Sequence, residues 1–190
     1  MNYVEDGSYW RGVTLCEHSG THIDALSHFF KDSENVDEIP LKRLIGRGVN
    51  IDVTHTPARG VTTVEDVKRF ENEHGELKEG DIVCFRFGWD KKWKAGEEGK
   101  AFMEDWPGIS KETAEYLLSK KVSAAADASA LDAIGTTNPA HKVLLGNGIY
   151  IIENVDKLDM LPPFFGVIGL PCRLKKGSGS TLRLIALIDK

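Results

Sequence analysis

The chain has 190 residues, is 41% hydrophobic and 28% charged, and carries a formal net charge of -5, which is ordinary for a globular protein, so one domain over residues 1–190 is expected. The negative charge and scattered lysines argue against nucleic acid as a partner, and no apolar run is long enough to span a membrane. The three cysteines form no CxxC pair and the N-terminus has no signal-peptide pattern, so we expect reduced thiols and a cytoplasmic location.

The first half of the chain predicts three strands and one helix. Alternating apolar residues predict a strand over Val13–His18, and two further apolar runs predict strands over Gly48–Thr54 and Asp81–Phe87. Thr62–Glu65 has the pattern of a capping box. We therefore expect a helix to begin there and to end at about His74–Gly75, where glycine stops it.

The second half begins with a segment, residues 88–109, that is too long for a simple connection and carries Trp89, Trp93 and Trp106. Beyond it the pattern alternates between helix and strand. Helices are expected over Ser110–Lys121 and from Thr137–Pro139 to Gly146, and strands over Val122–Asp127, Ile149–Glu153, Gly166–Leu170 and Thr181–Ile188. The whole pattern predicts an α/β fold: a single domain with a mixed central β-sheet flanked by helices.

Half of the six histidines of the chain fall within one stretch of eleven residues, HSGTHIDALSH, which begins at His18. His22 and Asp24 are two residues apart, so in an extended segment both point to one face, and the Ser-Gly-Thr turn could bring His18 back against them. Two imidazoles and a carboxylate make a competent site for zinc or manganese. A polar, hydrogen-bonded turn is the alternative explanation of the same residues.

The stretch resembles the HxGTHxDxPxH signature of the cyclase family of metal-dependent hydrolases. Other segments resemble further family motifs in the same order along the chain. They are Asp127–Asp132, His141, Gly148–Asn154 with Leu158, and Phe164–Pro171 with Arg183. The resemblance implies the family's swivelling β/β/α architecture and a divalent metal, with Zn²⁺ expected first, Mn²⁺ as the alternative, and one or two ions per chain.

The resemblance also implies roles for individual residues. His18, His22 and Asp24 match metal ligands of the signature, and His141 and Glu153 match the residues that complete a two-metal site. In that scheme Asp24 and Glu153 bridge the ions. His28 matches the proton shuttle, and hydrolysis of an amide by metal-activated water is the expected reaction.

This sequence departs from the family pattern in two ways. Leu26 stands where the signature has proline, which is expected to loosen the turn that carries His28 without removing a ligand. The signature also begins close to the N-terminus, so we expect the family's N-terminal leader to be lacking, either by truncation or because this is a shortened member.

Several other residues allow two interpretations each. Asp127, Ser129 and Asp132 either orient the ligands or form an Asx-type turn. The three tryptophans either wall an aryl substrate or close as a lid, or they pack a long loop onto the core. Instead of binding metal, Glu153 could form a salt bridge and His141 could be a solvent-exposed residue. Cys16 is expected to be a buried apolar thiol rather than a ligand, and Lys175–Ser180 is expected to be a surface turn.

The resemblance implies a small-molecule amide or lactam as substrate. An aryl formamide such as N-formylkynurenine, an arylformamidase reaction of tryptophan catabolism, is expected first. Isatin hydrolysis, or hydrolysis of another lactam or lactone, is the alternative within the same chemistry. A non-catalytic metal-binding homologue is the alternative of another class. By analogy with the family, the chain is expected to form a homodimer or homotetramer.

Overall fold

The computed structural model describes residues 7–127 and 129–189, and the strands of this part form a closed barrel in the order β1-β7-β6-β4-β2-β8-β9. The barrel strands are β1 (His22–Asp24), β2 (Ile45–Asp52), β4 (Ile82–Arg86), β6 (Ala124–Asp127), β7 (Tyr150–Glu153), β8 (Phe164–Pro171) and β9 (Gly179–Leu187). Strands β2, β4, β6 and β7 are parallel to their neighbours within this group, whereas β1, β8 and β9 are joined through antiparallel pairs. The predicted mixed sheet is therefore confirmed.

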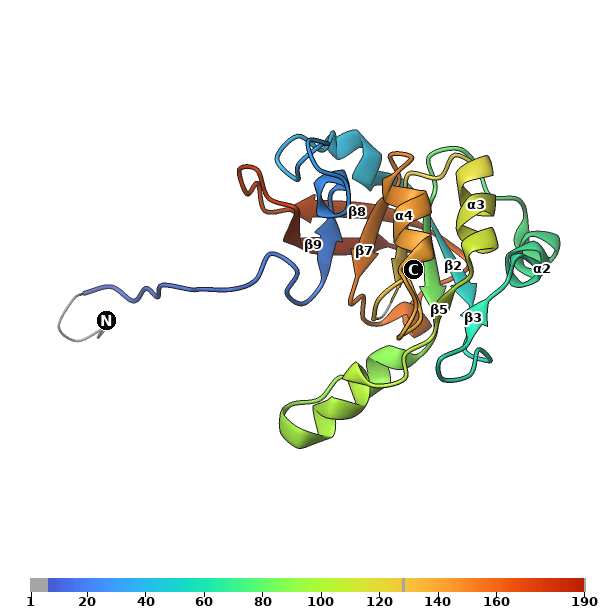
Figure 1. Cartoon of the computed structure of the whole chain (residues 1–190), viewed down its shortest axis with the longest axis horizontal. Coiled ribbons are helices and arrows are strands. Elements are labelled where there is room, and N and C mark those ends of the chain that lie inside the picture. Colours follow the sequence, from blue (N-terminus) through green and yellow to red (C-terminus); the bar gives the residue numbers. More distant parts are fainter. Residues whose placement is uncertain (1–6, 128, 190) are drawn as a thin grey trace.

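A short parallel sheet and the helices complete the fold (Figure 1). The short sheet joins β3 (Val61–Thr62) to β5 (Gly108–Ile109). The α-helices are α2 (Val64–His74), α3 (Lys111–Ser119) and α4 (Pro139–Leu145). The 3₁₀ helices are η1 (Leu26–His28), η2 (Leu41–Leu44), η3 (Trp89–Lys92), η4 (Gly96–Met103) and η5 (Leu158–Met160).

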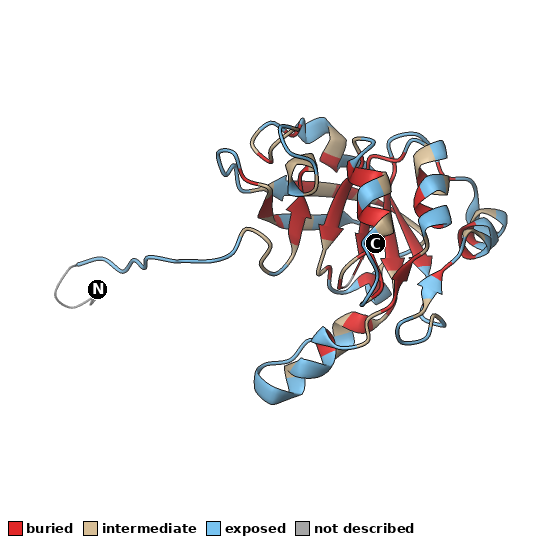
Figure 2. Ribbon diagram, viewed as in Figure 1, coloured by how far each residue is buried: buried red, intermediate tan, exposed pale blue. Residues whose placement is uncertain are grey.

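Two apolar cores follow from the alternation of side chains along the strands, and buried residues concentrate on the barrel strands and the helix faces turned toward them (Figure 2). On β7, Ile152 belongs to the core enclosed by the barrel, whereas Ile151 belongs to the core between the sheet and the α-helices. Leu117 of α3 and Leu144 of α4 pack into that second core. The α-helices therefore lie against one face of the barrel wall.

The helix boundaries follow from their caps. Helix α2 begins one residue later than the predicted capping box: Thr63 is the N-cap, and Asp66, not Glu65, reaches back to the backbone N–H of Thr63. The helix ends at the expected place, where Gly75 takes a positive φ of 117° that other residues avoid. Ser110 caps α3 by accepting a hydrogen bond from the Thr113 backbone.

The predicted strand over Val13–His18 is wrong. These residues form no strand, and Figure 1 shows residues 7–17 running outward from the barrel. A strand needs a hydrogen-bonded neighbour, and the first segment to find one is His22–Asp24, between β7 and β9. Cys16 is consequently exposed, which corrects its expected burial, whereas Cys84 on β4 is buried.

The long segment after β4 leaves the body of the molecule as η3 and η4, which project together (Figure 1). Among the described residues, no helix is long and apolar enough to cross a membrane.

Candidate metal centre

Strand β1 places two donor side chains on one face of the barrel wall. It pairs with β7 so that His22 lies opposite Glu153 and Asp24 lies opposite Ile151. Ile23, between them, points to the other face and is buried in the barrel core. The predicted common face of His22 and Asp24 is therefore confirmed, and it is the face that α4 covers, because Ile151 packs with the residues of that helix.

Helix α4 supplies His141 from its first turn. The expected start at Pro139 is confirmed, but the Asn138 side chain makes no capping hydrogen bond. Asp132 caps the helix instead: its carboxylate accepts hydrogen bonds from the backbone N–H groups of Ala140 and His141, each at 2.9 Å. The same carboxylate lies 2.6 Å from Nδ1 of the His141 ring. Asp132 thus positions both the helix and the imidazole.

His18 reaches the same place from the turn before β1. Its Nδ1 lies 2.8 Å from Oδ1 of Asp24, and its Nε2 lies 3.0 Å from Oγ of Ser178. Gly179 makes room for the ring, because a Cβ atom at that position would lie 2.5 Å from Cε1 of His18. The turn itself contains Gly20, whose φ of 62° favours glycine.

Five predicted ligands therefore come together in two groups of three that share Asp24. One group is His18, His22 and Asp24, the other is Asp24, His141 and Glu153, and within each the donor atoms lie within 4.8 Å of one another. The Asp24 oxygens face opposite ways: Oδ1 is 3.4 Å from Nε2 of His22, and Oδ2 is 3.5 Å from Nε2 of His141. The Glu153 carboxylate also lies between the two histidines. Its Oε2 is 3.6 Å from Nε2 of His22, and its Oε1 is 3.1 Å from Nε2 of His141.

These spacings fit a metal ion. Ligands 2.0–2.2 Å from a tetrahedral zinc ion lie about 3.3–3.6 Å from one another, close to the separations between the carboxylate oxygens and Nε2 of His22 and His141. Nδ1 of His18 is closer to Asp24, at hydrogen-bond distance. Each histidine also has its second ring nitrogen engaged elsewhere: His18 with Ser178, His22 with the Gly20 carbonyl and His141 with Asp132. Such partners hold Nε2 of His22 and of His141 toward a cation, whereas Nδ1 of His18 faces the Asp24 carboxylate. The donor set is of nitrogen and oxygen, which zinc and manganese both accept.

The electrostatics of the cluster favour positive charge. Burial opposes protonation of His141, but its contacts with Asp132, Asp24 and Glu153 outweigh burial and raise its pKa to about 12. Burial likewise opposes ionisation of Asp24, yet the surrounding histidines hold its pKa well below the usual value. The carboxylates therefore create a potential that a cation would neutralise.

His28 lies at the edge of the cluster, on η1. Its ring centroid is 4.2 Å from that of His18, and the residue is exposed. Burial of the ring, together with His18 and His141, lowers the pKa of His28 against the opposing effect of Asp24. The lowered pKa favours the neutral imidazole, which lies beside the donor cluster but outside both groups of three donors.

Asp127 adds a further polar side chain beside the donors of β1 and β7, at the end of the neighbouring strand β6. Ala126 pairs with Ile152, so Asp127 comes next to Glu153. Burial and the Glu153 carboxylate raise the pKa of Asp127 well above its usual value. Within the described residues, Oδ2 of Asp127 and Oγ of Ser129 are buried without a hydrogen-bond partner. Oδ1 of Asp127 accepts a 3.2 Å hydrogen bond from the Ser129 backbone, so an Asx-type turn is present at this position.

The three tryptophans have different surroundings. Trp89 is buried in the core beside the α-helices and donates to the Phe102 carbonyl of the same loop. Trp106 is half-buried, packs against that core and donates to the Asp132 carbonyl, so both rings pack the loop onto the body. Trp93 remains 60% exposed, and its ring stands nearly perpendicular to that of Phe102. Trp93 and Phe102 line a cavity of about 330 Å³.

The sequence analysis did not predict two residues that position His18, which are Ser178 and Gly179. Lys175 and Lys176 are exposed as expected, but the expected surface turn is wrong for the residues after them, because Ser178 contacts His18 and Gly179 is buried against its ring. Glu17 then holds Ser178 through its backbone N–H and its hydroxyl. No local signal links residues 160 positions apart, because the contact exists only when β9 closes the barrel against β1.

The described residues form a closed β-barrel with a donor cluster suited to a divalent cation. The cluster lies on the face of β1 and β7 that α4 covers. A family model described as "Putative cyclase" matches residues 2–133 of this chain. The chain belongs to the cyclase family, which confirms the resemblance seen in its signature.

The names of similar proteins give two activities. An isatin hydrolase from Roseibium aggregatum is 32% identical over 99% of this chain and 79% of its own length. A kynurenine formamidase from Bacillus mycoides is 28% identical over 91% of this chain and 77% of its own length. Among solved structures, an isatin hydrolase bound to the product analogue thioisatinate has a TM-score of 0.90 at 33% identity, covering 100% of this chain and 80% of that one.

Proposed function

We propose that this chain is a metal-dependent hydrolase that cleaves the C–N bond of an aryl amide. The observation that carries the proposal is the pair of donor groups that share Asp24. In this proposal His18, His22, Asp24, His141 and Glu153 are the ligands. A bound divalent cation supplies a Lewis acid and lowers the pKa of bound water from 15.7 to about 7.

The residues of the chain supply the remaining parts of the reaction. Hydrolysis adds water across the amide, so the C–N bond breaks, a C–O bond forms and the leaving nitrogen gains a proton. An imidazole nitrogen of His28 takes a proton from the attacking water and returns it to that nitrogen. Asp132 holds His141 in place, and we assign Asp127 and Ser129 to the support of Glu153, because β6, which ends at Asp127, neighbours the strand of Glu153.

An isatin-type cyclic amide is the first substrate candidate. It is supported by the 32% identity to an isatin hydrolase and by the TM-score of 0.90 with a solved one. An open aryl formamide such as N-formylkynurenine is the second candidate, supported by the 28% identity to a kynurenine formamidase. The ratio of kcat/KM for isatin to that for N-formylkynurenine decides between them.

We further propose zinc as the metal, with manganese as the alternative, and up to two ions per chain because two donor groups are present. The cytoplasmic location, the single domain over residues 1–190 and the homodimer or homotetramer remain predictions. Metal analysis of the purified chain and light scattering test the stoichiometry and the oligomer.

The assignment of roles is tested with three histidine variants. His28→Ala is expected to keep bound metal and to lose turnover by about 10²–10⁴-fold, the usual contribution of a proton-transfer group. His22→Ala is expected to lose both metal and turnover. His74→Ala is the control, because its ring lies on α2 against Phe70 and outside the donor groups, so it should retain both.

Turnover of His28→Ala at the wild-type rate would remove His28 from the mechanism. A metal-loaded wild-type chain that hydrolyses neither isatin, N-formylkynurenine nor a lactone would instead favour the non-catalytic metal-binding homologue.

A further inference from the structure

A cavity of about 330 Å³ is lined by chain neighbours of the donor cluster but by none of its five donors, and the proposed chemistry makes no use of it. Its wall includes Gly20 and Asn154. The Gly20 carbonyl accepts the 2.8 Å hydrogen bond from Nδ1 of His22, and Asn154 directly follows Glu153. A molecule held at the donor cluster could therefore extend into this cavity, whose volume is at the lower end of the range for small-molecule sites.

The lining of the cavity combines aromatic rings with carboxylates. Trp93 and Phe102 come from the projecting η3–η4 segment, and their ring centroids are 4.8 Å apart. Asp90 and Asp156 supply the charge, and the described lining residues include no lysine, arginine or histidine. Burial, Asp156 and Asp159 together raise the pKa of Asp90, which indicates that these carboxylates repel one another across a short distance.

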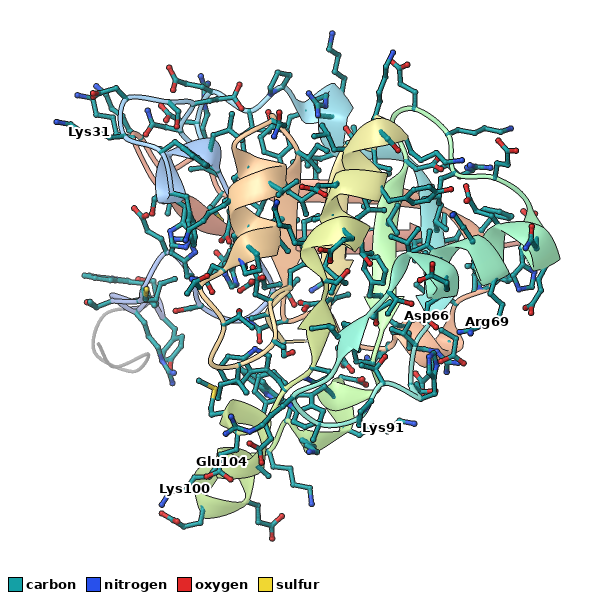
Figure 3. The ribbon with its side chains drawn as sticks, turned by 45° about the vertical axis from the view of Figure 1, so that its right-hand side comes forward. Lys31, Asp66, Arg69, Lys91, Lys100 and Glu104 are labelled. Atoms are coloured by element: carbon teal, nitrogen blue, oxygen red, sulfur yellow. The ribbon has the colours of Figure 1, made fainter. Side chains whose placement is uncertain are left out.

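The neighbouring lysines do not fill this cavity. Lys91 lies 3.8 Å from Asp159, its side chain is 68% exposed, and Figure 3 shows it extending outward from the body. The Lys92 amine lies over the Trp89 ring, 3.2 Å from its centroid. The negative charge of Asp90 and Asp156 is therefore available to a ligand.

The geometry favours an organic cation over a metal ion. In the described part of the chain, two groups of three donors lie close enough to share an ion, and neither contains Asp90 or Asp156. An exposed indole face and nearby carboxylates are instead the elements that recognise substituted ammonium groups, through cation–π attraction and ion pairing.

We propose that this cavity binds a protonated amine carried by the aryl amide substrate, with Trp93 contacting the cation and Asp90 pairing with it. The inference rests on the proposed hydrolase function for the identity of the substrate. It concerns those aryl amides, cyclic or open, that bear an ammonium substituent; isatin carries none and would bind at the donor cluster without filling this cavity. Amides bearing a carboxylate but no ammonium group at that position are disfavoured, because Asp90 and Asp156 would repel it.

Binding of small aryl probes tests the cavity without requiring hydrolysis. The full chain, with and without added zinc, is titrated with benzylamine, benzyl alcohol and benzoate, and binding is followed by calorimetry. Benzylamine is expected to bind about 10-fold more tightly than benzyl alcohol, because cation–π and ion-pair contributions add, and benzoate is expected to bind most weakly to the zinc-free chain.

Matched variants identify the groups responsible. Asp90→Asn should reduce the preference for benzylamine over benzyl alcohol to about 2-fold, because the ion pair is lost while the cavity keeps its shape. Trp93→Ala should weaken benzylamine about 5–10-fold and Trp93→Phe much less, since phenylalanine retains an aromatic face. Glu97→Gln is the control: Glu97 is an exposed carboxylate on η4, paired with Lys100, and does not line the cavity.

Equal affinity for benzylamine and benzyl alcohol in the wild-type chain would overturn the inference, as would an equal effect of Asp90→Asn and Glu97→Gln. Its failure is distinct from failure of the proposed function. A preference for benzylamine in a chain that hydrolyses no amide would support the cavity assignment and refute the hydrolase function. Hydrolysis of an amide by a chain without this preference would support the hydrolase function and refute the cavity assignment.

Discussion

Asp132→Asn tests the link between the start of α4 and the donor cluster. The Asp132 carboxylate accepts three hydrogen bonds, one by Oδ1 from the Ala140 backbone and two by Oδ2, from the backbone and the ring of His141. Asparagine has the same shape but only one acceptor oxygen. Whichever way the amide is oriented, its NH₂ group faces an N–H donor and at least one of these contacts is lost.

The expected magnitude follows from the burial of this residue, which is 3% exposed. A hydrogen bond to a charged group contributes about 1.5–3 kcal/mol, and loss of an N-cap costs about 0.5–2 kcal/mol. Because the cap and the ring contact share one carboxylate, the losses overlap, and we expect Asp132→Asn to lower the free energy of unfolding by about 2–4 kcal/mol. Loosening the His141 ring should also weaken metal binding about 10–100-fold.

The assay measures both quantities on the same samples. Urea denaturation of the chelator-treated protein gives the free energy of unfolding, and zinc competition with a chromophoric chelator gives the affinity. Asp66→Asn is the control, because the Asp66 carboxylate also accepts a hydrogen bond from a backbone N–H at a helix start, that of Thr63 on α2. Asp66 pairs with Arg69 beside it (Figure 3) and belongs to neither donor group. It should lose stability and keep the wild-type affinity for zinc.

Equal zinc affinities for Asp132→Asn and Asp66→Asn would refute this reasoning. Asp132 would then be a helix cap only, and the orientation of His141 would depend on its contacts with Asp24 and Glu153.

Three further predictions concern other parts of the chain. Gly179→Ala should push the His18 ring aside and weaken zinc binding with little loss of stability, whereas Gly46→Ala, whose Cβ would meet its nearest atom at 3.6 Å, should leave zinc affinity unchanged. Cys84 is buried and burial raises its pKa to about 12, so a thiol reagent at pH 8 should label two cysteines in the native chain and the third only after unfolding. Burial opposes ionisation of Asp66, but its hydrogen bonds outweigh burial and lower its pKa below 3.8. Ionised Asp66 therefore stabilises the fold fully above that value, and the stabilisation is lost as the pH falls through the lowered pKa. In a plot of the free energy of unfolding against pH, Asp66→Asn should show a shallower decrease at acid pH than the wild-type chain.

Local chemistry explains why much of the secondary structure could be predicted. Ser110 and Pro139 mark helix starts through interactions within one turn, and Gly75 ends a helix through its own φ angle. The capping box of α2 was misplaced by one residue because Thr62 and Thr63 both satisfy a pattern that depends only on spacing. The strand expected over Val13–His18 failed for a different reason, since apolar alternation shows what a strand would bury but not whether a partner strand is available.

The sequence by itself determined that His22 and Asp24 share a face, because a strand repeats every two residues. It also indicated the set of donors through the family signature. Only the tertiary structure decided that the strands close into a barrel, that β1 lies between β7 and β9, and that Ser178 and Gly179 hold His18. These features depend on contacts between segments distant in the chain, which form when the whole barrel assembles and leave no trace in local spacing.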